Sequence, residues 1–293
     1  MKNIGGQAVI EGVMMKGKSG WTVAVRGPKG EIHVKRERLK ELPGIFRIPV
    51  LRGFIALFHS LLIGVKAIEF SAGKAYEEDE GKPINPYAMA FTILFSMFLG
   101  IVLFILLPLY ATKLLGIWVV KVSESSLVFN LVDGVIRIAF FLLYVIAIGL
   151  WKDMRRIFEY HGAEHKVIHA FENGKDLTLE HIKGNSPLHP RCGTSFLLIV
   201  MVISIFTFSF IPQDWIFLYK FLSRIILIPL IAGLSYEILK LTAKMKHNVL
   251  MHLLIQPGLF LQKLTTREPD EEQIEVAVRA LKEVLTLEEA NAR

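Results

Sequence analysis

Cysteine is almost absent from the chain. Cys192 is the single cysteine among 293 residues, which excludes an internal disulfide and fits the reducing side of a membrane. The first twelve residues, MKNIGGQAVIEG, lack the apolar core of a cleavable signal, so we expect no cleaved leader. The glycine-rich run GGQAVIEGVMMKG lacks both the Lys-Ser/Thr ending and the following helix of a phosphate loop, which argues against nucleotide binding.

Charge is also missing, but only from certain stretches. Hydrophobic residues make up 53% of the chain, and several long segments carry almost no charge. A membrane-spanning helix needs about 20 apolar residues to cross roughly 30 Å of hydrocarbon. The sequence predicts four such spans, at 88–111, 127–151, 193–211 and 217–241.

A fifth apolar stretch, at 45–70, is interrupted by Arg47, Arg52, His59 and Lys66. We interpret it as an amphipathic helix that lies on the membrane or packs against the bundle, with a fifth span as the alternative.

The predicted fold is mainly α, a polytopic membrane helix bundle with small additions at both ends. We expect a three-stranded β meander at 1–41, an interfacial helix and linker at 42–86, and the four-span bundle at 87–243. The loop at 152–192 belongs to that bundle. The segment 244–293 should contain an amphipathic helix with the apolar stripe Ile274, Val278, Leu281 and Leu285.

The positive charges indicate an orientation. Lys and Arg are concentrated before the first span, in the loop 152–192 and after the fourth span, so these parts should be cytoplasmic. We expect a multi-pass protein of the cell inner membrane with both termini in the cytoplasm. The net charge of +7 then favours anionic lipid headgroups as partners, and no nucleic-acid motif accompanies it. Asp133 and Arg137, one turn apart, are expected to form a structural pair within the membrane.

The segment EYHGAEHKVIHAFENG contains the side chains that are candidates for metal binding and catalysis. In a helix, His161 and His165 point to one side, with Glu164 beside them. His-x-x-Glu-His is the inverted form of the zinc-protease motif, in which two histidines hold the metal and the glutamate takes a proton from water. We therefore predict a divalent metal, zinc above all, on His161 and His165, with Glu164 as the catalytic base.

A catalytic zinc needs a third protein ligand, and the sequence offers several. We favour Glu237, because a carboxylate at the end of a span needs a partner. His169, one turn further along the motif helix, and His189 and Cys192 in SPLHPRCGTS are further possible ligands.

Five stretches carry a resemblance to a known family: GGQAVIEGVMMKG, YHGAEHKVIHAFE, HPRCGTSFLL, SYEILK and QPGLFLQKLTTREPDEEQIEVA. Together they resemble the YqhQ-like family of bacterial membrane proteins of unknown function, over nearly the whole chain. The resemblance implies a predicted metal-dependent enzyme.

Two classes of function follow from these patterns. The first is a membrane-embedded metal-dependent hydrolase acting at the cytoplasmic interface on a peptide or a lipid-linked substrate. The alternative is a non-catalytic membrane assembly or transport component with a structural metal or a polar core. A diiron lipid oxidase is disfavoured because the chain has no adjacent His-His pair.

Overall fold

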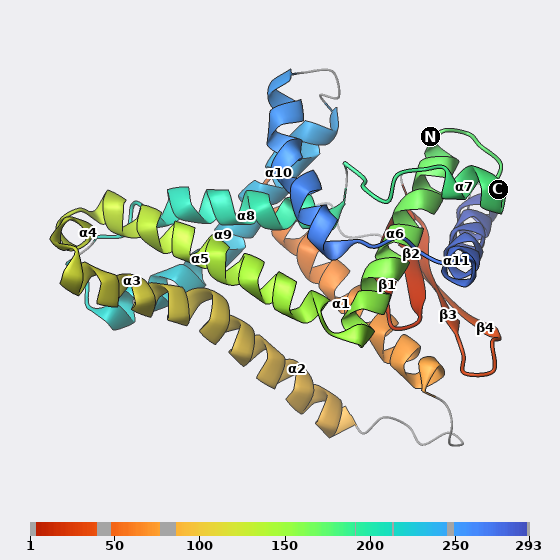
Figure 1. Ribbon diagram of the computed structural model, residues 1–293, viewed down its shortest axis with the longest axis horizontal. Coiled ribbons are helices and arrows are strands. Elements are labelled where there is room, and N and C mark those ends of the chain that lie inside the picture. The colour runs from red at the N-terminus through yellow and green to blue at the C-terminus, as the bar shows by residue number, and fades with distance from the viewer. Residues whose placement is uncertain are drawn as a thin grey trace.

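The computed structural model describes residues 4–39, 48–76, 86–190, 192–212, 214–244 and 249–291. Arg47 and the outer residues of the predicted meander lie outside this part. Long helices form a bundle at one end of the molecule, and a small sheet flanked by helices lies at the other (Figure 1). The fold is therefore mainly helical with a small N-terminal sheet, as predicted.

The bundle is built from apolar helices. Its elements are α2 (Pro86–Ile101), the π-helical segment η2 (Val102–Leu106), α3 (Leu107–Trp118), α4 (Val120–Glu124), α5 (Ser126–Gly149), α8 (Gly193–Phe208), α9 (Phe217–Lys244) and α10 (Val249–Thr265). The π-helical segment ends two residues before Pro108, which lacks the N–H that would bond one turn back. The run from α2 to α3 nevertheless continues as one long helix.

Three of the four predicted spans coincide with helices that are long and apolar enough to cross a membrane, and the described residues contain four such helices. They are Leu51–Ala75, Ala90–Trp118, Ser126–Gly149 and Phe217–Leu241. The predicted span at 193–211 is shorter than expected, because α8 has 16 residues and is about 24 Å long. The stretch assigned to the interface instead has the length and composition of a span.

Helix α1 (Leu51–Ala75) connects the bundle to the sheet. Near its start Gly53 meets α9, where an added Cβ would lie 2.9 Å from the carbonyl oxygen of Gly233. Further along, Ile63 and Ala67 are buried against the sheet. The first half of this helix thus packs against the bundle, and its second half packs against the sheet.

The sheet has four antiparallel strands in sequence order, not the three predicted. They are β1 (Gly5–Val9), β2 (Gly12–Lys16), β3 (Gly20–Arg26) and β4 (Ile32–Arg38). The additional break is the two-residue turn Ile10–Glu11, where Glu11 adopts a positive φ of 49°. Such turns usually carry Asn or Gly, so this one gave no clear signal in the sequence.

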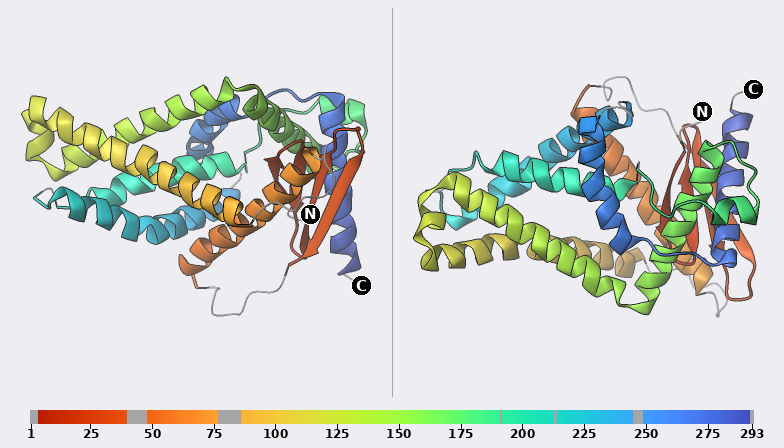
Figure 2. Two further views of the ribbon diagram at one scale, coloured as in Figure 1. Left: turned by 90° about the horizontal axis from the view of Figure 1, so that it is seen from below. Right: turned by 45° about the horizontal axis from the view of Figure 1, so that its top comes forward.

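Helices cover both faces of the sheet. One face packs against α6 (Lys152–Glu172) and α11 (Glu271–Ala290), with the short α7 (Leu179–Lys183) alongside. The other face packs against α1, and Figure 2 shows the strands between α1 and α11. Burial on both sides explains why β2 and β3 read as nearly continuous apolar runs. The sheet rests on the helical part and the tail, as expected.

The predicted C-terminal amphipathic helix is α11. Asp270 and Gln273 form a capping box at its start, and Ile274 and Leu281 are buried in the core against the sheet and α6. This helix holds the sheet against the helix that carries the histidine motif.

Candidate metal centre

Helix α6 carries His161 and His165 on one face, with ring centroids 4.4 Å apart. Cys192, at the start of α8, approaches them from a distant part of the sequence. One nitrogen from each histidine and Sγ of Cys192 all lie within 4.8 Å of one another. Two ligands of a tetrahedral zinc lie about 3.5 Å apart, so the three atoms are close to the spacing of a shared ion.

Backbone carbonyls orient both imidazoles. Nδ1 of His161 lies 2.8 Å from the carbonyl oxygen of Thr265, and Nδ1 of His165 lies 2.5 Å from that of Pro187. A carbonyl oxygen only accepts, so each Nδ1 carries the proton and each neutral ring has its lone pair on Nε2. This is the arrangement usual around metal-binding histidines.

Nε2 of His165 is buried and has no hydrogen-bond partner among the described residues. An unpartnered polar atom at this depth costs stability unless something binds it. Burial also lowers the pKa of the His165 imidazole to about 2, so the ring is neutral and its lone pair is available. The residues present therefore fit a bound cation.

Cys192 lies at the N-cap of α8, where its sulfur accepts hydrogen bonds from Thr194. The backbone nitrogen and Oγ1 of Thr194 lie 3.5 Å and 3.3 Å from Sγ. These donors and the helix N-terminus favour the thiolate, whereas burial raises the pKa of the Cys192 thiol. Nε2 of His161 is 3.2 Å from the same sulfur.

Glu164 lies beside the three donor atoms, with Oε2 3.4 Å from Nε2 of His165. Burial raises the pKa of the Glu164 carboxyl to about 8, and a backbone hydrogen bond from Gly6 in β1 acts in the opposite direction. An added Cβ at Gly6 would lie 2.6 Å from Cγ of Glu164. The glycine therefore makes room for this carboxylate.

The β1–β2 hairpin is tied to α6 at a second point. Nε and Nη2 of Arg156 donate to the two carboxylate oxygens of Glu11 at 2.6 Å and 2.5 Å, and the hydroxyl of Tyr160 lies 3.3 Å from Oε2. Glu11, which belongs to the GGQAVIEGVMMKG stretch, thus ties the hairpin to the helix that carries the histidines.

A groove opens where this hairpin meets α1. Its volume is ≈ 350 Å³, and its lining residues are Gly5, Gly6, Gln7, Met14, Lys16, Gly17, Ser60 and Ile63. Gly6 lines this groove, and a Cβ added to it would lie against Glu164 of α6. Helices α1 and α6 cover opposite faces of the sheet, so the groove and the candidate centre lie on either side of β1.

Glu237, the predicted third ligand, lies elsewhere. Its carboxylate accepts from Nε of Arg52 at 2.7 Å and forms a second, shorter contact with Nη2 of the same guanidinium. The residue is at the end of α9, as expected, but α1 packs there and supplies its counter-ion. Cys192, one of the further possible ligands, is the residue that approaches both histidines.

The two other possible ligands lie next to the group without joining it. Nε2 of His169 bonds to the carbonyl oxygen of Leu188 at 2.9 Å. The ring of His189 is 5.7 Å from that of His165, and its Nε2 is 3.4 Å from Oε2 of Glu172. His169 therefore follows His165 on the same face of α6, and His189 lies beside these two rings.

Several residues that support the site were not predicted from the sequence. Gln262 of α10 bonds to both the backbone nitrogen and the oxygen of His189, at 2.8 Å and 2.9 Å, which fixes the loop before Cys192. An added Cβ at Gly162 would lie 2.0 Å from the carbonyl oxygen of Arg267, so the chain after α10 crosses α6 at this glycine. Both partners fall within a stretch, QPGLFLQKLTTREPDEEQIEVA, that is part of the family resemblance.

The predicted pair Asp133 and Arg137 does form, with Nη2 of Arg137 2.7 Å from Oδ2 of Asp133. It belongs to a larger polar cluster in the bundle, away from the histidines.

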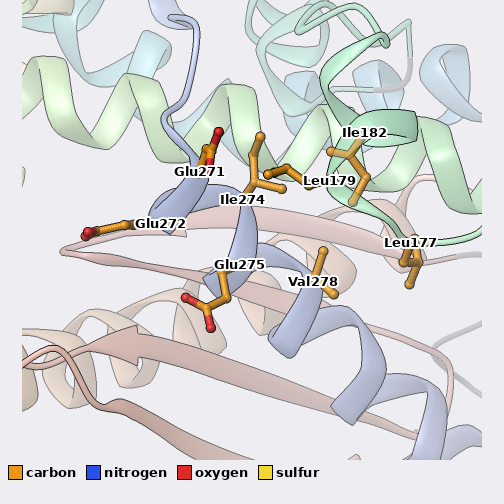
Figure 3. Close-up of a pocket in the computed structure, with 8 residues that line it drawn as sticks. All are labelled: Leu177, Leu179, Ile182, Glu271, Glu272, Ile274, Glu275 and Val278. Atoms are coloured by element: carbon orange, nitrogen blue, oxygen red, sulfur yellow. The ribbon is translucent and has the colours of Figure 1, made fainter.

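A further hollow lies between α7 and α11. It is lined by Leu177, Leu179, Ile182, Glu271, Glu272, Ile274, Glu275 and Val278 (Figure 3). Two of its carboxylates are paired with cations, because Lys183 bonds to Glu271 and Arg26 bonds to Glu275. It shares no residue with the His161–His165–Cys192 group.

The chain is similar to known sequences over most of its length. The family described as "Protein of unknown function (DUF1385)" matches residues 48–287. The "Uncharacterized protein YqhQ" of Bacillus subtilis (strain 168) is 33% identical over 300 residues, which cover 97% of this chain and 92% of the relative. No solved structure matches the chain. The chain therefore belongs to the DUF1385 family.

Proposed function

We propose that the protein is a membrane-embedded metal-dependent hydrolase, in which His161, His165 and Cys192 hold a zinc-like divalent ion. The observation that carries the proposal is the convergence of ligand atoms of His161, His165 and Cys192 within 4.8 Å, where the buried Nε2 of His165 has no hydrogen-bond partner among the described residues. Three protein ligands leave a fourth position open, which is the usual arrangement of a catalytic zinc.

A metal ion held there would supply Lewis acidity and lower the pKa of a water molecule. Glu164 has the position of the general base, because its carboxylate is adjacent to His165 and is held by the backbone of Gly6. The carbonyls of Thr265 and Pro187 keep both imidazoles in the tautomer that binds. Thr194 holds the sulfur of Cys192 in place.

The substrate class follows from the location of the centre. Helix α6 directly follows the candidate span Ser126–Gly149, so the histidines lie just beyond the end of a membrane helix. A peptide or lipid-linked substrate at the cytoplasmic interface suits this position at the end of a span.

The second candidate function is a non-catalytic assembly or transport component with a structural metal. Glu164 is the observation that favours it, because a carboxylate 3.4 Å from His165 could occupy the fourth position and close the site. The two functions assign different roles to the same residue, so a substitution of Glu164 separates them.

The test compares purified Glu164→Gln, His165→Ala and His169→Ala proteins. Metal content is measured by elemental analysis, and hydrolysis is assayed on panels of fluorogenic peptides and lipids. We expect His165→Ala to lose most of the metal and Glu164→Gln to keep it while losing hydrolysis. His169→Ala is the matched control, since its ring lies outside the group.

Loss of the metal from Glu164→Gln would favour the closed structural site. Equal metal content in wild type and His165→Ala would contradict both functions, because each depends on that ligand.

A further inference from the structure

The bundle contains a buried polar cluster that is separate from the histidine site. Asp133 of α5 bridges two arginines: Oδ2 accepts from Nη2 of Arg137 at 2.7 Å, and Oδ1 accepts from Nη1 of Arg224 in α9 at 2.8 Å. Asn130 accepts from Nη2 of Arg224 at 3.0 Å, and Ser204 of α8 lies 3.3 Å from Nη1 of Arg137. Three helices meet at this cluster.

The charges in the cluster do not balance. The two guanidiniums carry one positive charge each, whereas Asp133 supplies one negative charge. Within the described part of the chain, Asp133 is the only carboxylate in contact with either arginine. One positive charge is therefore left over inside an apolar bundle, where it is costly.

The arginines also keep unused donors. Nε of Arg137 and Nε of Arg224 are buried and have no hydrogen-bond partner among the described residues. Arg224 is 1% exposed and Arg137 8% exposed, so water does not satisfy them from the surface. Both guanidiniums lie over the ring of Phe208, at 4.9 Å and 5.1 Å from its centroid.

Further cations lead from the cluster to the distal end of the bundle, which is the end away from the sheet (Figure 1). Lys220 lies one turn before Arg224 on α9, with Nζ 4.7 Å from the ring centroid of Phe129. Lys113 of α3 lies over the ring of Phe217 at 5.5 Å. Such a series of positive charges attracts anions toward the buried pair.

From the excess charge and the unused donors, we infer that Arg137 and Arg224 form a binding site for an anion that carries a phosphate group. Guanidinium groups match the geometry of phosphate oxygens. Two guanidiniums around one carboxylate also leave a net charge of +1, which the ligand would neutralise. The phosphate could belong to a lipid headgroup or to a free ion that enters from the distal end. The site does not depend on the proposed metal centre.

Two substitutions remove the excess charge in opposite ways. Asn130→Asp adds a carboxylate of nearly the same shape that already faces Arg224. Arg137→Met removes one cation and leaves Arg224 paired with Asp133. Asn173→Asp is the control, because it makes the same chemical change at an exposed position at the end of α6.

The experiment measures the melting temperature of delipidated full-length protein in an uncharged detergent. One arm titrates inorganic phosphate, and the other adds phosphatidylglycerol. We expect a saturable rise of about 3 °C at roughly tenfold the Kd in wild type and Asn173→Asp. Asn130→Asp and Arg137→Met should show no saturable rise, and if one of them fails to fold the other decides.

A response to phosphate identifies a free anion, and a response to phosphatidylglycerol alone identifies a lipid headgroup. The inference is overturned if wild type responds to neither probe. It is equally overturned if either folded variant responds as wild type does, because binding would then occur elsewhere.

Discussion

At the scale of single residues, the candidate centre depends on groups that hold its ligands as much as on the ligands themselves. His161 and His165 are oriented by carbonyls from two separate segments, and Glu164 lies against Gly6 of a strand more than 150 residues away in sequence. The sequence predicted the histidines and the glutamate because they share one helical pattern. It did not predict their partners, because these come from elements that only the fold brings together.

Substitutions of Gly6 and Gly5 test whether the position of Glu164 depends on the strand beside it. Gly6→Ala should lower the free energy of unfolding by about 1–3 kcal/mol, because its Cβ would overlap Glu164, and should reduce hydrolysis by displacing the carboxylate. Metal content should stay close to that of wild type. Chemical denaturation, elemental analysis and the hydrolysis assay measure the three effects.

Gly5→Ala serves as the control, since nothing lies within 4 Å of its added Cβ. Similar losses in both variants would mean that the strand tolerates no side chain for reasons unrelated to Glu164.

At the scale of elements, helix positions were easier to predict than helix contacts. The motif helix and α11 follow from their periodicity, and the Ile10–Glu11 turn was missed because it lacks the usual turn residues. Glu237 has the expected place at the end of α9. Its partner could not be predicted, because the close approach of α1 at Gly53 and Gly233 depends on how two helices pack.

Glu237→Gln should leave metal content unchanged, because the carboxylate pairs with Arg52 and not with the histidines. His161→Ala, measured alongside by elemental analysis, should lose most of the metal. A loss of metal from Glu237→Gln as large as that from His161→Ala would restore Glu237 as a ligand.

At the scale of the whole molecule, the bundle and the sheet are linked by helices that belong to both. Helix α1 packs against α9 and the sheet, and α6 extends from the end of α5 to the face of β1. The candidate centre lies where these parts meet, with Cys192 supplied by the first turn of α8. The predicted bundle and sheet could be derived from composition and periodicity, whereas this junction could not.

The proposed orientation can be tested with cysteine probes in a Cys192→Ser background. Lys175→Cys, beyond the end of α6, should be protected from a membrane-impermeant reagent added to intact cells. Glu124→Cys, at the distal end of the bundle, should be labelled, because the positive-inside rule puts these positions on opposite sides. Labelling of Lys175→Cys from outside would reverse the topology.

X-ray absorption spectroscopy of the zinc-loaded full-length protein shows whether two histidines and one cysteine hold the same ion. We expect one sulfur at about 2.3 Å and two imidazole nitrogens at about 2.0–2.1 Å, with the remaining coordination from oxygen. Cys192→Ser should lose the sulfur contribution. A wild-type spectrum without a sulfur neighbour, or with oxygen ligands alone, would contradict the claim.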